Sequence, residues 1–269
     1  GSTTGSSIGA TCYALTSYST YFRSMSCTAT ALYKGTTNLG TIGAIVTELY
    51  LSDTVMSGQE VICFATGGSA AYFCFKDAVT TNFPTFDGTT HTNTTIDGIT
   101  STTGLYAGQR ITGTGIQANT RIASVDSATA ITTTIATTAS ATITITKEAI
   151  AVIIDADYPT QNINSVSAMN GYMFTAVNDK IYNCPINAPW LLTSTDYISA
   201  DYGGDNVGTI FKFGDYIIAA GSASRQYFQI IGNSSGSVLS SVRSLNKITD
   251  TAIYRPRFVG GSGYSFSGA

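Results

Sequence analysis

The residue types that carry out most enzyme chemistry are scarce in this chain. It has a single histidine, His91, which lies in the Thr- and Asn-rich stretch FDGTTHTNTT. Ser-His-Asp or Cys-His catalysis would have to use His91, and a metal site with two histidines is impossible. We interpret His91 as a solvated loop residue. The sequence has no GxxxxGK[ST] phosphate loop, and no helical pattern follows the GxG at Gly113 and Gly115, so a nucleotide site is not indicated.

Aspartates are the remaining candidates for catalysis, because a glycoside hydrolase needs two carboxylates at a defined separation. Asp155 and Asp157 would share one face of an extended strand, although the Tyr-Pro that follows them indicates a turn. Asp196, Asp201 and Asp205 are further candidates. Turn aspartates that accept hydrogen bonds from their own backbone explain the same positions. We therefore predict that the protein is not an enzyme and has no catalytic, cofactor or metal residues, with a glycoside hydrolase as an alternative.

The five cysteines, which are an odd number and form no CxxC pair, do not suggest a zinc site or a disulfide framework. They are Cys12, Cys27, Cys63, Cys74 and Cys184. Two of them lie in apolar, strand-like contexts, VICF and YFCF, where a free cysteine acts as a small hydrophobic residue. We predict buried free thiols, with one disulfide as the alternative.

The only tryptophan, Trp190, follows Asn-Ala-Pro and precedes two leucines. It is either a core anchor or, with Tyr197 and Tyr202, an aromatic platform on which a sugar could stack. The second interpretation predicts a carbohydrate-binding adhesin or a receptor-binding virion protein.

The composition excludes other classes of protein. Among 269 residues, 43% are hydrophobic, 11% are charged, and the formal net charge is −3, which argues against a basic nucleic-acid clamp and a polybasic membrane patch. No apolar run reaches the roughly 18 residues of a membrane helix. The first methionine is Met25 and no signal peptide is visible, so we expect a processed chain or part of a longer one. The 27 glycines and the long Thr and Ser tracts predict many strands and tight turns.

Three hairpins resemble copies of one unit. They read SGQEVICFATGGSAAYFCF, NGYMFTAVNDKIYN and FGDYIIAAGSASRQYFQI, each with a glycine turn before an apolar strand and an aromatic residue in the next strand. The turn glycines Gly171 and Gly214 are 43 residues apart, and the aromatic residues Tyr182 and Tyr227 are 45 apart. A period of 40–50 residues with paired strands is typical of β-propeller blades, which bury their faces against each other.

The first and second hairpins are separated by a segment of different composition. From Thr89 to Thr146 there are 20 threonines and only four charged residues. Its apolar residues alternate with polar ones, which gives each strand one face to bury. We therefore predict an all-β fold of propeller-like blades with a small inserted β domain: blades in residues 1–88, the insert in 89–146, and further blades in 147–269. A disordered low-complexity linker is the alternative for the insert.

The stretch from Ile154 to Ile231 resembles the tail hub, or packaged-DNA-stabilising, proteins of podoviruses, the short-tailed bacteriophages. The segments that carry the resemblance are IDADYP, SVSAMNGYMFTA, IYNCPINAPWLLTSTDYISAD and DNVGTIFKFGDYIIAAGSASRQYFQIIGN, with LGTIGAIVTELYLSD before them. The stretch GLYAGQRITGTGIQANTRIASVDS, from Gly104 to Ser127, is similar to a β module of phage virion proteins. The nozzle proteins of related tails have a similar propeller, so the resemblance fits hub and nozzle alike.

This resemblance implies a structural protein of the phage tail, located in the virion. It would form a ring with copies of itself, a hexamer, below the portal and adaptor proteins, and it would carry tail spikes or fibres. The ring would retain packaged DNA and conduct it at ejection without binding it specifically. A tube wall of this kind should not bind DNA phosphates tightly. The 13 basic and 16 acidic residues suit that role, because the acidic residues outnumber the basic ones. Neither a cofactor nor a membrane span is expected.

Overall fold

The computed structural model confirms the prediction of an all-β fold. It describes residues 13–15, 19–23, 25–45, 49–200, 206–222, 224–232, 237–246, 257–259 and 263–265, and the side chains of 13–15, 243–246, 257–259 and 263–265 are not considered below. These residues form antiparallel sheets and one short helix, α1 (Lys76–Thr80). In this part of the chain, no helix is long and apolar enough to cross a membrane.

Three sheets are four-stranded antiparallel meanders whose strands follow each other in chain order. We name them blades 1, 3 and 4. Blade 1 contains β1 (Tyr13–Leu15), β2 (Met25–Cys27), β3 (Ala31–Lys34) and β4 (Thr37–Thr41). Blade 3 contains β14 (Ser165–Met169), β15 (Tyr172–Val177), β16 (Lys180–Asn183) and β17 (Tyr197–Ser199). Blade 4 contains β18 (Thr209–Phe213), β19 (Tyr216–Ala220), β20 (Ser224–Ile230) and β21 (Leu239–Asn246). A two-stranded sheet of β22 (Arg257–Val259) and β23 (Gly263–Ser265) follows.

Blade 2 is completed by a strand that arrives from far along the chain. Its first strands are β5 (Tyr50–Met56), β6 (Gln59–Ala65) and β7 (Ala71–Phe75). Its fourth strand is the end of β13 (Ser140–Val152), where Ala151 and Val152 pair with Phe73 and Tyr72 of β7. The chain therefore leaves blade 2 after β7 and returns to it in β13.

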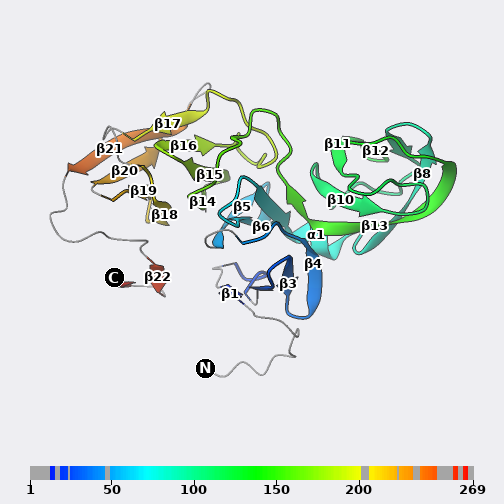
Figure 1. Cartoon of the computed structure of the whole chain (residues 1–269), viewed down its shortest axis with the longest axis horizontal. Helices are drawn as coiled ribbons and strands as arrows, with labels where there is room; N and C mark the ends of the chain where they lie inside the picture. Colours follow the sequence, from blue (N-terminus) through cyan, green and yellow to red (C-terminus); the bar gives the residue numbers. More distant parts are fainter. Residues whose placement is uncertain are drawn as a thin grey trace.

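The segment of the chain between β7 and the end of β13 forms the inserted module, residues 76–147. After α1 it contains β8 (Thr85–His91), β9 (Thr95–Asp97), β10 (Gln109–Thr112), β11 (Ile122–Ser127) and β12 (Ala130–Thr133). The first part of β13 pairs with β8, from Ser140 opposite His91 to Thr146 opposite Thr85. Figure 1 shows the module projecting to one side of the blades. The strand β8 begins at Thr85, upstream of residue 89, where the sequence pattern placed the boundary.

The first strands of blades 2, 3 and 4 lie side by side. The Ala168 N–H in β14 donates to the Ser52 hydroxyl in β5, 2.9 Å away, and the Lys212 ammonium in β18 donates to the Asp53 carbonyl, also 2.9 Å away. Each of these strands ends in a tight turn at one of the glycines that marked the sequence repeat, Gly58, Gly171 and Gly214, all with positive φ. Figure 1 shows the blades following each other along an arc, as successive blades of a propeller do.

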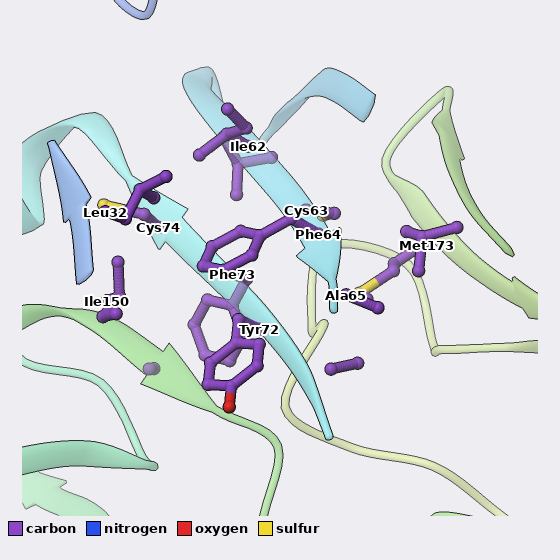
Figure 2. Packing of buried hydrophobic residues seen from close by; sticks show 14 of the residues in the cluster. Leu32, Ile62, Cys63, Phe64, Ala65, Tyr72, Phe73, Cys74, Ile150 and Met173 are labelled. Carbon is purple, nitrogen blue, oxygen red and sulfur yellow. The ribbon is translucent and has the colours of Figure 1, made fainter. Parts of the chain in front are cut away.

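The blades bury their faces against each other in two clusters, and the inserted module has a third core of its own. In the first cluster, Leu32 of blade 1, Phe64 and Phe73 of blade 2 and Met173 of blade 3 gather around the middle blade (Figure 2). The second cluster joins blades 3 and 4. The core of the module is made mainly of isoleucines from its strands. Packing of this kind is what a series of small sheets needs, because no single one can bury both of its faces.

Four of the five cysteines, Cys27, Cys63, Cys74 and Cys184, are buried, and the thiols of Cys63, Cys74 and Cys184 are free, as predicted. Burial raises the pKa of the Cys74 and Cys184 thiols to about 12. These thiols therefore act as small apolar core groups rather than as reactive ones. Cys12 lies outside the described residues.

Candidate functional site

Trp190 lies in the connection between β16 and β17, half-buried against an aromatic cluster. Its ring centroid is 6.1 Å from that of Phe73, 6.3 Å from that of Phe75 and 5.8 Å from that of Tyr106. Phe73 and Phe75 belong to blade 2, and Tyr106 belongs to the inserted module. The indole therefore packs where blade 2, the module and the β16–β17 connection meet.

The second sugar-stacking candidate, Tyr197, lies apart from this cluster on the outer strand of blade 3. Its ring centroid is 5.4 Å from that of Tyr182, and the Lys180 ammonium lies 4.0 Å from the centroid of Tyr197. In the described part of the chain, no ring contact joins Tyr197 to Trp190. Tyr202, the third candidate, lies outside the described residues.

The candidate aspartates that the structure describes make contacts with the backbone. Asp155 accepts hydrogen bonds from the N–H groups of Asp157, at 2.9 Å, and Leu192, at 3.3 Å. The Asp196 N–H donates to the Thr193 carbonyl at 2.8 Å. Asp201 and Asp205 lie outside the described residues. These contacts are those of aspartates that form turns.

His91 is the last residue of strand β8, so its prediction as a loop residue is wrong. Its Nε2 lies 2.8 Å from an Asp97 oxygen on the partly exposed face of the module. The misplacement has a physical reason: Thr and Asn are typical of loops, but β8 alternates buried and more exposed positions, with Thr90 among the buried ones, and the strand pairs with β13. The described residues contain no group of three or more His, Cys, Asp or Glu side chains that could hold a metal ion.

The most elaborate polar arrangement in the structure is the attachment of the inserted module to blade 2, which we call the module junction. At its centre is Gln109, whose side chain is fully buried. Its Oε1 accepts the Tyr106 N–H at 2.9 Å, and its Nε2 donates to the carbonyls of Gly104, at 3.3 Å, and Ala149, at 3.2 Å. One amide thus pairs with three buried backbone groups, of which the Gly104 carbonyl also accepts a hydrogen bond from Lys147.

Two glycines let the backbone approach closely at the module junction. A Cβ built on Gly108 (φ +89°) would lie 1.9 Å from the Val152 carbonyl oxygen of β13. A Cβ built on Gly104 (φ +81°) would lie 2.6 Å from the Asp77 carbonyl oxygen. The segment GLYAGQ, which begins the stretch that is similar to a β module of phage virion proteins, therefore attaches the module to blade 2.

Two buried charged residues complete the module junction. The Lys147 ammonium, 3% exposed, donates to the carbonyls of Ala78, at 3.1 Å, and Gly104. The Asp77 carboxylate accepts hydrogen bonds from the Tyr106 hydroxyl and the Gln59 amide, both at 2.8 Å. Burial lowers the pKa of Lys147 to about 8 and, as the largest cause, raises the pKa of Tyr106.

A second contact fixes the module against blade 1. The Arg110 guanidinium of β10 lies 2.6 Å from a Glu148 carboxylate oxygen, and the Thr41 hydroxyl of β4 donates to the same oxygen at 2.9 Å. Arg110 also donates to Thr41 at 3.1 Å. The module is thus held at two points, on blade 1 and on blade 2, and its orientation relative to the blades is defined.

We predict that Trp190→Ala will lower the free energy of unfolding by about 3 kcal/mol, because it removes the indole from contact with three other rings. Chemical denaturation followed by circular dichroism would measure it. The matched control is Leu191→Ala at the next position, where the side chain is 46% exposed and the loss should stay within about 0.5 kcal/mol. Equal losses in the two variants would show that the indole contributes no more than a surface residue.

We also predict a pH dependence that comes from Lys147. Its pKa is about 8 in the folded protein and 10.5 ordinarily, so between these values the unfolded chain binds more protons and this residue makes stability rise with pH. The wild type should therefore gain roughly 3 kcal/mol relative to Lys147→Met between pH 8 and 10.5. The buried thiols, whose raised pKa values act in the opposite direction, are common to both proteins. A difference in unfolding free energy that does not change with pH would contradict the prediction.

No protein-family model matches the chain, and no curated protein matches it. Among solved structures, the endosialidase of phage phi92 is similar with a TM-score of 0.32 and 12% sequence identity, over 87% of this chain and 43% of that chain. The chain thus spans less than half the length of that structure, and a similarity at this TM-score does not establish a shared fold.

Proposed function

We propose that this protein is a structural component of a phage virion, a hub or nozzle protein of a short tail. In this role copies of the chain assemble into a hexameric ring below the portal and adaptor proteins, so that the blades of all copies together surround the tail axis. The proposal agrees with the resemblance of residues 154–231 to podoviral tail hubs and with the succession of blades whose first strands lie side by side.

The observation that carries the proposal is the attachment of the inserted module at two points. A module on a flexible linker could sample many directions, whereas one held by the buried Gln109 and by the Arg110–Glu148 ion pair keeps one direction. In a ring, fixed modules would project at regular angles around the axis. Such an arrangement suits the attachment of tail spikes or fibres, which must take defined positions on the tail.

The few charged residues in the first strands of blades 2, 3 and 4 agree with a channel through which DNA passes without being bound. Within β5, β14 and β18 the only charged residues are Asp53 and Lys212, and the Lys212 ammonium donates to the Asp53 carbonyl. Affinity for DNA rises steeply with each basic side chain that reaches a phosphate. Strands that carry a single basic residue between them would let packaged DNA pass without specific binding.

Two measurements test this function. Native mass spectrometry of the purified full chain should show a hexamer, alone or with the adaptor protein added. Antibodies against the inserted module, coupled to gold, should label the tail of intact virions in electron micrographs. A chain that stays monomeric with the adaptor present, together with virions that carry no label on the tail, would refute the proposal.

A further inference from the structure

The inner strand β19 of blade 4 buries residues on both of its faces. Successive side chains of a strand alternate between the two faces of the sheet. Ile217 and Ala219 share one face and belong to the second cluster, between blades 3 and 4. Ile218 and Ala220, on the other face, are each only 4% exposed, although they belong to none of the three clusters that the described residues form. Blade 3 therefore covers one face of β19, and the burial of the other face needs a different source.

The face of blade 4 that points away from blade 3, which we call the outer face of blade 4, is also aromatic. Beside Ile218 and Ala220 it carries Tyr216 of β19 and Tyr227 of β20, whose ring centroids are 6.4 Å apart. Tyr227 lies directly opposite Ile218 in the register of the two strands, and both tyrosines are half-buried. Aromatic side chains that bury much of their area in this way are typical of a surface packed against another layer of protein.

A sheet face that meets solvent has a different composition in this protein. In the inserted module, Ile143 and Ile145 of β13 contribute to the module core, and the alternate positions of the same strand are exposed threonines, Thr142, Thr144 and Thr146. This is the pattern of an antiparallel sheet that is covered on one side only. The corresponding row in β19 is Tyr216, Ile218 and Ala220, so we expect the outer face of blade 4 to be covered.

The sequence that follows blade 4 has the side chains for such a cover. One face of blade 2 and one face of blade 3 are each buried against the blade that comes next in the chain. Residues 247–269 come directly after β21, and their hairpin of β22 and β23 follows blade 4 along the arc of blades (Figure 1). The large apolar and aromatic residues of this segment are Ile248, Ile253, Tyr254, Phe258, Val259, Tyr264 and Phe266.

We propose that residues 247–269 pack on the outer face of blade 4, with their apolar and aromatic side chains against Tyr216, Ile218 and Tyr227. The segment then begins a fifth blade, which buries the last face of blade 4 as each earlier blade buries its neighbour. This packing lies within one chain and does not rest on the ring proposed above. It removes the outer face of blade 4 from the surfaces through which copies of the chain could meet.

Photocrosslinking of the full chain tests this proposal. Tyr227 is replaced by the photoreactive residue p-benzoyl-L-phenylalanine, which forms a covalent bond only with groups that it contacts. After irradiation we expect a product that keeps the mass of the monomer on a denaturing gel, and in which mass spectrometry finds position 227 joined to a peptide from residues 247–269. The same replacement at Tyr216 should give the same result, and it keeps the test decisive if the variant at Tyr227 does not fold.

The matched control is the same replacement at Val125, which is 40% exposed on strand β11 of the inserted module. It should give no product with residues 247–269. A crosslinked dimer on the denaturing gel would show that a second copy covers the face and would overturn the proposal. So would the absence of any crosslink from both tyrosine positions, a bond to another part of the chain, or an equal yield from Val125. A hexamer without the expected crosslink would contradict this inference alone, and the crosslink in a protein that forms no ring would contradict only the proposed function.

Discussion

Gly108→Ala is expected to lower the free energy of unfolding by more than about 4 kcal/mol, enough to unfold much of the protein. The new methyl carbon would lie 1.9 Å from the Val152 carbonyl oxygen, and the residue would keep a φ of +89° that disfavours any side chain. Because the Val152 N–H also donates to the Gly108 carbonyl, at 3.3 Å, neither segment can move away without losing the module junction. Urea denaturation followed by far-UV circular dichroism would give the loss.

Gly214→Ala separates the contribution of close contact from that of backbone conformation. Gly214 also has a positive φ, +56°, but a Cβ there would meet no atom within 4 Å. We expect this variant to lose about 1 kcal/mol, the cost of a left-handed conformation for a residue with a side chain. Similar losses in Gly108→Ala and Gly214→Ala would mean that the junction is not tightly packed.

Gln109→Leu is expected to lower the free energy of unfolding by about 3 kcal/mol or more. Leucine has a similar volume, so no cavity arises, but it leaves the Tyr106 N–H and the Ala149 carbonyl buried without their partner, while the Gly104 carbonyl keeps its bond from Lys147. Each buried group left unpaired costs about 1–3 kcal/mol. The loss would again be measured by urea denaturation. Hydrogen exchange should become faster in the module before the blades, because the module would lose its attachment first.

The control for this variant is Gln117→Leu in the same module. The Gln117 amide also donates to a backbone carbonyl, that of Ala136, at 2.7 Å, but in an exposed position. Water can replace this bond, so the loss should stay within about 0.5 kcal/mol. Equal losses of unfolding free energy in Gln109→Leu and Gln117→Leu would mean that the buried hydrogen bonds of Gln109 do not stabilise the module junction.

Much of the blade architecture could be predicted from local patterns. The alternation of apolar and polar residues predicts the strands. The hairpins are predicted by the repeated turn glycines Gly58, Gly171 and Gly214. Both signals are local, because each depends only on neighbouring residues in one strand or turn. The buried cysteines could be predicted for the same reason, since their apolar neighbours lie in the same strands.

The module junction could not be predicted, because it joins residues that are far apart in the sequence. Nothing local shows that Gln109 contacts Ala149, that Tyr106 contacts Asp77, or that Trp190 packs against Tyr106. One signal was present: in ITITKEAI, Lys147 follows Ile143 and Ile145 at alternate positions, and Ile145 is buried in the module core. A lysine in the inward register of a strand predicts a buried ammonium that needs carbonyl partners.

The central claim, that the blades surround a tail axis as part of a virion, is tested most directly by cryo-electron microscopy of the assembled phage tail. We expect a ring of six copies on the tail axis, into which the blades and the projecting module fit in the relative orientation found here. A map in which this chain lies away from the axis, or occurs as a single copy, would contradict the claim.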